Sequence, residues 1–198
     1  MTMTHDYKDN DLLTRVHDLG YSVFTSGAWN LNLIGVRTES RTSGQFDDWF
    51  NIICWDEQDR LIHRQFQCTT DPATYFLSKP INVNGAAILC AGQYRGAYRI
   101  AKHRGKYDAL CQRKAVKVYR DDNRDEILDM EVDDIQQGLY GINIHRAGEK
   151  NEAPNNWKWS AGCQVLPSPI DFDEVMVYAR RQLKERGWDS FTYTLIED

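Results

Sequence analysis

The chain has 198 residues, and 41% of them are hydrophobic, so it can bury one sizeable core and nothing in its length requires a second domain. Its formal net charge of -5 argues against a general electrostatic attraction to nucleic-acid phosphates, so nucleic acid is not an expected partner. No apolar run approaches the length of a membrane span, so a membrane is not an expected partner either.

The first predicted element is a short amphipathic helix. Apolar residues recur at helical spacing from Leu12 to Leu19, and the pattern stops at Gly20. We therefore expect residues 1–24 to form an N-terminal helical extension of a single domain that spans residues 1–198.

Strands are predicted from Trp29 onward, because apolar residues now recur at every second position. Residues 49–55 and 61–68 flank a polar turn and predict a hairpin. Gly-rich or charged turns separate the remaining predicted strands, which cover residues 86–90, 94–100, 107–111, 115–120 and 139–145.

The last predicted element is a helix that begins near Asp171, a natural N-cap, and ends near Gly187. Together these patterns predict a mainly β (α+β) fold of mixed, β-sandwich-like sheets with a short N-terminal helix and a C-terminal helix. The apolar spacing predicts that the buried face of the C-terminal helix consists of Val175, Met176, Ala179 and Leu183.

The chain has five cysteines, an odd number at wide spacings, which does not suggest a fully paired disulfide framework. Cys163 stands apart because it follows Ser160, Ala161 and Gly162 rather than an apolar run. The other four lie among apolar or aromatic neighbours, where cysteine usually behaves as a small buried hydrophobe: Cys54, Cys68, Cys90 and Cys111.

Residues 141–165 contain the strongest candidate chemistry. Ile142 and Ile144 are expected to face the core, which turns His145 outward at the end of a strand. The polar loop that follows is long enough to bring Cys163 back to His145 at modest entropic cost. An imidazole within hydrogen-bond reach lowers the pKa of a thiol by stabilising the thiolate, so we interpret Cys163 as a nucleophile activated by His145.

The residues around Cys163 suit an acyl-transfer site. Gly162 permits a tight backbone, so the amides of Gly162 and Cys163 are expected to point at a developing oxyanion. Ser160 is expected to brace this turn or to donate a further hydrogen bond. The alternative interpretation is a histidine satisfied by a backbone carbonyl and a small buried cysteine behind a glycine turn.

His145, followed after a polar loop by Ser160, Ala161, Gly162 and Cys163, resembles the His then Ser-x-Gly-Cys signature of the L,D-transpeptidase catalytic domain, the YkuD-like family. The resemblance covers about residues 141–165. It implies a β-rich catalytic domain of the L,D-transpeptidase type, in which Cys163 attacks a carbonyl of a peptidoglycan stem peptide and His145 acts as the base.

The chain departs from the family pattern at two positions. Ala161 stands where members commonly have a second histidine, and Val165 stands where they commonly have an arginine. Arg146, directly after the proposed base, is a candidate replacement for the missing positive charge. Asn143 and Trp159 are the other candidate substrate contacts, although Trp157 and Trp159 are more often expected as loop anchors packed against the body. The basic segment 95–106, which includes His103, is expected to be a solvated strand and turn.

The leading functional hypothesis is therefore an L,D-transpeptidase-like cysteine transferase or hydrolase that forms a thioester with peptidoglycan stem peptides. Two alternatives remain open. The first is a catalytically inactive virion or cell-wall-binding module of the same fold, and the second is a Cys-His hydrolase acting on a cytoplasmic amide. The oligomeric state and the choice between transpeptidation and hydrolysis are not predicted.

The first residues do not resemble a secretory signal peptide, because no basic segment is followed by an apolar one. We therefore expect synthesis in the cytoplasm, with access to the wall after lysis, by injection or as part of a virion. No cofactor or metal is expected. Asp121, Asn123 and Asp125 alternate like the start of an EF-hand loop, but Glu126 and Val132 stand where that loop needs glycine and glutamate.

Overall fold

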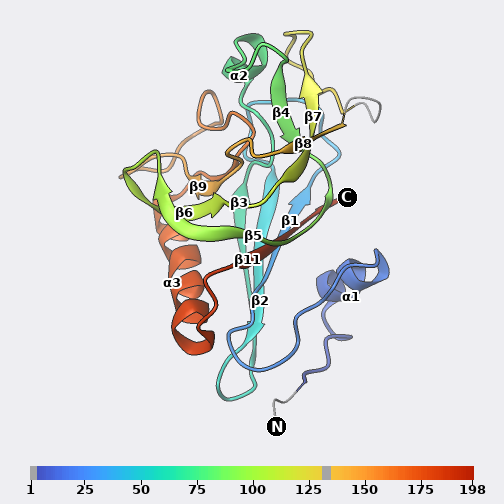
Figure 1. Cartoon of the computed structure of the whole chain (residues 1–198), viewed down its shortest axis with the longest axis vertical. Coiled ribbons are helices and arrows are strands. Elements are labelled where there is room, and N and C mark those ends of the chain that lie inside the picture. The colour runs from blue at the N-terminus through green and yellow to red at the C-terminus, as the bar shows by residue number, and fades with distance from the viewer. Residues whose placement is uncertain (1–3, 131–134) are drawn as a thin grey trace.

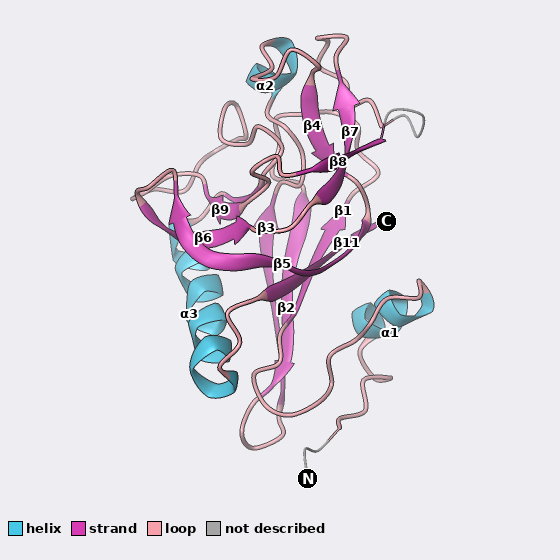
Figure 2. Ribbon diagram, viewed as in Figure 1, coloured by secondary structure: helices cyan, strands magenta, loops and turns pink. Residues whose placement is uncertain are grey.

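The computed structural model describes residues 4–130 and 135–198, and it is mainly β with a helix near each end (Figures 1 and 2). The predicted fold class, with mixed sheets and two terminal helices, is confirmed. The elements are α1 (Asp11–Asp18), β1 (Asn32–Arg37), β2 (Asp48–Trp55), β3 (Leu61–Cys68), α2 (Thr74–Ser78), β4 (Ala86–Leu89), β5 (Gly92–His103), β6 (Tyr107–Gln112), β7 (Val116–Asp121), β8 (Ile135–Gly138), β9 (Ile144–Arg146), β10 (Gln164–Leu166), α3 (Pro169–Arg186) and β11 (Phe191–Glu197).

A large sheet in the order β10-β9-β6-β5-β11-β1-β2-β3 forms the body of the protein, and a small sheet in the order β4-β7-β8 lies above it in Figure 1. The expected hairpin is present, because β2 and β3 pair antiparallel from Asp48↔Cys68 to Trp55↔Leu61. β1 pairs parallel with β11, and β9 pairs parallel with β10, so the large sheet is mixed.

The central position of β11 was not predicted from the sequence. This C-terminal strand lies between β1 and β5, with Tyr193 opposite both Leu33 and Tyr94. Phe191, Tyr193 and Leu195 are buried in the main core. Their alternation with threonines is a strand pattern that the sequence does contain.

Both faces of the large sheet are covered where β1, β2 and β11 lie side by side. On one face, α3 contributes Phe172, Val175 and Met176 to the main core. On the other face, Leu13 and Val16 of α1 pack in a second cluster of buried residues, to which the sheet contributes Ile34, Val36, Ile53, Trp55 and Ile196. This double cover explains why every residue of β1 is buried.

Helix α3 differs from its prediction at two points. Ser168 rather than Asp171 is the N-cap, since the Ser168 side chain accepts from the amide of Asp171, and Pro169 opens the first turn. Leu183 is 39% exposed, whereas Gln182 is only 4% exposed. The Gln182 amide is satisfied there because it accepts from the amide of Leu31 and donates to the carbonyl of Ser190.

The strand predicted for residues 139–145 is also wrong in its bounds. β8 ends at Gly138, and β9 begins at Ile144, so an irregular segment separates two strands of different sheets. Val132, one of the two positions at which the segment departs from an EF-hand loop, lies outside the described residues. Of the helices in the described ranges, none has both the length and the apolar character needed to cross a membrane.

Candidate active site

The parallel pair of β9 and β10 brings the two ends of the 141–165 segment together. Val165 lies opposite His145 and Gln164 opposite Ile144, so Cys163 directly precedes this register. The backbone amide of Asn143 donates to Cys163 Sγ at 3.4 Å, and Sγ donates to the carbonyl of Gly141 at 3.3 Å. The thiol is thus held against the segment that leads into His145, although no hydrogen bond joins Cys163 to His145 among the described residues.

His145 is buried rather than facing outward, with 5% of its surface exposed. Its Nδ1 lies 2.8 Å from the carbonyl of Arg146. Because a carbonyl oxygen only accepts, Nδ1 carries the hydrogen and Nε2 keeps a free lone pair. This is the tautomer that a general base needs at Nε2.

His103 is a site residue that the sequence analysis assigned to a solvated turn. It is buried, and its ring stacks on His145 with 4.1 Å between the ring centroids. The turn between β5 and β6 positions it, since His103 pairs with Tyr107 at the end of that hairpin. His103 and Tyr107 together cover His145, since His103 stacks on the His145 ring and the Tyr107 hydroxyl lies 3.4 Å from His145 Nδ1.

The Asn143 side chain fixes the tautomer of His103. Its Oδ1 accepts from the amide of Gln112 at 2.9 Å, so its Nδ2 is the atom that faces His103 Nδ1 at 3.1 Å. An amide nitrogen donates, so His103 Nδ1 accepts and a neutral His103 carries its hydrogen on Nε2. The two stacked imidazoles therefore have opposite tautomers, one offering a base and the other a donor. Asn143 therefore holds the His103 ring in place, and it also lines the cavity that contains Cys163.

The expected resting ion pair between Cys163 and His145 is wrong. Burial raises the pKa of the Cys163 thiol to about 11, against the opposing effects of the Asn143 amide and the positive charge of Arg104. Burial, together with the charges of His103 and Arg104, lowers the pKa of His145 to about 3. Both groups are therefore neutral near pH 7, so a nucleophilic role of the sulfur would require proton transfer during its attack.

These pKa values predict how the thiol reacts with pH. Since the thiolate is the reactive form, alkylation of Cys163 by iodoacetamide should accelerate about tenfold for each pH unit from pH 7 to pH 10. Peptide mapping by mass spectrometry gives the rate for each cysteine, and Cys163→Ala gives the background. A plateau of the Cys163 rate near neutral pH would mean that the thiol is already ionised, contrary to this expectation.

The turn before Cys163 is tied to the body by buried hydrogen bonds. Ser160 Oγ donates to the carbonyl of Cys163 at 2.7 Å and accepts from the amide of Gly162 at 3.1 Å, which is the bracing role expected for Ser160. Asn156, fully buried, accepts from the amide of Ser160 and donates to Thr69 Oγ1. The Gly162 amide is therefore engaged and does not point at an oxyanion as predicted. The amides of Ala161 and Cys163 have no hydrogen-bond acceptor within the described part of the chain.

Gly162 is needed for its conformation and for its lack of a side chain. Its φ is 115°, and an added Cβ would lie 2.1 Å from the carbonyl oxygen of Ala87. We expect Gly162→Ala to lower the free energy of unfolding by at least about 2 kcal/mol. Gly141→Ala is the matched control, because Gly141 has a φ of 72° but no atom within 4 Å of an added Cβ. Urea unfolding of both variants measures the difference, and equal losses would refute the steric argument.

Two neighbouring cavities open around these groups and share Phe76, His103 and Arg104 in their walls. The first, of about 560 Å³, is lined by His145, and the second, of about 420 Å³, by Cys163. We call them together the Cys163 groove. The linings contain no carboxylate among the described residues, and their cationic residues are Arg104, Lys106, Arg120, Arg146 and Lys158.

The other candidate substrate residues lie on the His145 side of the groove. Arg146 stacks over the Tyr107 ring at 4.6 Å and donates to the carbonyl of Glu149. Trp159 and Trp157 are both exposed, and Trp157 contacts Tyr75 edge to face. The aromatic pair therefore presents surface at the rim of the cavity that His145 lines.

Several residues of the groove lining come from segments that are distant from residues 141–165 in the sequence. Arg104 and His103 belong to the β5–β6 hairpin, Phe76 to α2 and Arg120 to β7. No cluster of three or more histidine, cysteine or acidic side chains arranged to hold a metal occurs within residues 4–130 and 135–198. Comparison of the chain with known proteins finds no matching family model, no similar curated protein and no similar solved structure.

Proposed function

We propose that this chain is a cysteine acyl-transfer enzyme of the L,D-transpeptidase type, with peptidoglycan stem peptides as its substrate. The observation that carries the proposal is the pair of opposite histidine tautomers that lines the same groove as Cys163. His145 has an unprotonated Nε2, and His103 carries a hydrogen on Nε2. A reaction that removes a proton from a thiol and stabilises an oxyanion needs one group of each kind.

The first half-reaction follows from these roles. As Cys163 Sγ bonds to the substrate carbonyl carbon, its proton leaves the Gly141 carbonyl and passes to His145 Nε2. The negative charge that develops on the substrate oxygen is stabilised by the amide of Cys163 and by the Nε2 hydrogen of His103. Collapse of this intermediate breaks the carbon–nitrogen bond, and the departing amine takes the proton from His145.

The second half-reaction resolves the resulting thioester. Neutral His145 accepts a proton from water or from an acceptor amine as that group attacks the thioester carbonyl, and Cys163 leaves with the returned proton. Water gives hydrolysis and an amine gives transpeptidation, so both outcomes use the same residues. A peptide that bears carboxylates suits the Cys163 groove, because the described lining of the groove contains cationic side chains and no acidic one.

The test is turnover of purified stem tetrapeptides and of soluble amide and thioester substrates, followed by mass spectrometry. The proposal expects new products from the wall peptides with the wild-type chain and none with Cys163→Ala. Equal turnover by both proteins would overturn the cysteine mechanism. Turnover confined to the soluble substrates would instead favour a cytoplasmic amide hydrolase, and binding of the wall without any product would favour a non-catalytic module.

A further inference from the structure

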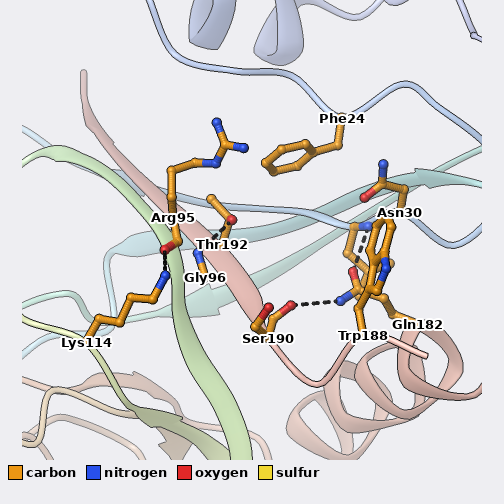
Figure 3. Close-up of a pocket in the computed structure, with 10 residues that line it drawn as sticks. Phe24, Asn30, Arg95, Gly96, Lys114, Gln182, Trp188, Ser190 and Thr192 are labelled. Carbon is orange, nitrogen blue, oxygen red and sulfur yellow. Dashed lines mark hydrogen bonds between the residues drawn. The ribbon is translucent and has the colours of Figure 1, made fainter. Parts of the chain in front are cut away.

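A second pocket lies at the other end of β5 from the Cys163 groove. Its walls come from β5, the start of β11 and the end of α3, and its volume is about 400 Å³ (Figure 3). We call it the Trp188 pocket. It is lined by Phe24, Asn30, Leu31, Arg95, Gly96, Lys114, Gln182, Trp188, Ser190 and Thr192. Arg95 and His103 are eight residues apart on β5, which is up to about 26 Å along a strand, so the two sites are separate.

The charged side chains around the Trp188 pocket are all cationic. Arg95 and Lys114 lie in its wall, and Arg186 stacks over the Trp188 ring at 4.1 Å. None of these three cations forms an ion pair in the described part of the chain, and the described lining contains no carboxylate. In a chain of net charge -5, three unpaired cations around one pocket favour an anionic ligand.

The directions of the cationic side chains agree with this role. Figure 3 shows Arg95 and Phe24 extending toward one another, and the Arg95 guanidinium lies 5.2 Å from the Phe24 ring centroid. One Arg95 nitrogen donates to Ser22 Oγ, and its other donors have no acceptor within residues 4–130 and 135–198. Lys114 Nζ donates to the backbone carbonyl of Arg95 at 3.1 Å and has further hydrogens to donate.

The uncharged lining has the features of a sugar-binding surface. Trp188 is 45% exposed, and the part of its indole that Arg186 does not cover offers an aromatic surface against which a ring can pack. Asn30 Oδ1 and Ser190 Oγ have no hydrogen-bond partner among the described residues. The Thr192 hydroxyl accepts from the amide of Gly96 at 3.0 Å and still has its own hydrogen to donate. An aromatic surface beside several small polar groups is suited to a ring with hydroxyls, and the pocket volume lies at the lower end of the range for small-molecule sites.

From these observations we propose that the Trp188 pocket binds an anionic saccharide, a single sugar ring that carries a carboxylate. The carboxylate contacts Arg95 and Lys114, and the ring packs on Trp188 with its hydroxyls near Asn30 and Ser190. This proposal does not depend on the acyl-transfer reaction. A free uronic acid and a muramic acid unit of wall glycan both provide this chemistry.

The test is two-dimensional NMR of the full chain during titration with matched sugars. Glucuronic acid is compared with glucose, and N-acetylmuramic acid with N-acetylglucosamine, because each pair differs in the acidic group. The proposal expects shifts at the Trp188 indole and the Lys114 amide with the acidic member of at least one pair, and much weaker shifts with its neutral partner. The pair that binds more tightly identifies the source of the sugar.

Two variants connect the binding to the pocket. Arg95→Gln and Trp188→Ala should each weaken binding at least about tenfold. Arg99→Gln is the matched control, since Arg99 is exposed on the same strand, outside the pocket lining, and loses the same charge. Equal shifts with neutral and acidic sugars would refute the charge argument. Equal shifts with acetate would refute the role of the ring, and no shifts with any sugar would overturn the proposal.

Discussion

Replacement of Cys163 by serine should reduce acyl transfer by at least about 1,000-fold while leaving the fold intact. A serine hydroxyl has the same shape and keeps the hydrogen bond to the Gly141 carbonyl, which the Sγ donates at 3.3 Å. It is a far weaker nucleophile than a thiol, and His145 alone cannot compensate. Turnover of stem peptides and the melting temperature are measured on the same preparation.

Cys111→Ser is the matched control for this prediction. Cys111 is also half-buried, and its Sγ donates to the carbonyl of Ala101 at 3.4 Å, so the same substitution there changes a similar environment. The Cys111 variant should keep wild-type turnover. A comparable loss in both variants, or substantial turnover by Cys163→Ser, would remove the special role of Cys163.

The second large effect concerns the stacked histidines. His145→Ala should slow acylation by about 100-fold to 10,000-fold, because the base that takes the thiol proton is lost. His103→Ala should slow it by about 100-fold through loss of an oxyanion donor. Single-turnover kinetics with a thioester or stem-peptide substrate measure both rates.

The dependence on pH distinguishes the two roles. Without His145 the reaction depends on thiolate formed by the solvent, so His145→Ala should regain rate steadily as the pH rises toward the Cys163 pKa of about 11. The ratio of His103→Ala to wild type should change little with pH, since a donor and not a base is missing. Recovery at high pH by His103→Ala alone would reverse the assignment of base and donor.

The sequence predicts the fold class and most strands because their apolar spacing is local. Of the two roles that it allows for Ser160, the structure shows the bracing of the turn. The expected approach of Cys163 to His145 is seen at the level of the paired strands, without a hydrogen bond between the two side chains among the described residues. The alternating residues of β11 are typical of a strand, but this local pattern does not reveal that the strand lies between β1 and β5. The apolar spacing of α3 predicts that Leu183 is buried, but Gln182 is buried instead. The Gln182 amide can be buried because it forms hydrogen bonds with Leu31 and Ser190.

The features of the site that the sequence does not predict depend on contacts between distant segments. His103 lies 42 residues before His145 in the chain, and only the pairing of β5, β6 and β9 brings their rings together. The tautomers depend on the carbonyl of Arg146 and the side chain of Asn143, which no local pattern reveals. Cys163 and His145 are neutral at rest because both are buried, and the number of residues between them in the sequence does not predict their burial.

The central claim is that Cys163 forms a covalent thioester. Intact-mass measurement of the wild-type chain after brief mixing with a stem tetrapeptide, followed by digestion and mapping, tests it directly. We predict a mass increase equal to the acyl fragment, located on the peptide that contains Cys163 and lost on treatment with hydroxylamine. An adduct located on Cys54, Cys68, Cys90 or Cys111, or product formation without any adduct on Cys163 in rapidly quenched samples, would contradict the account.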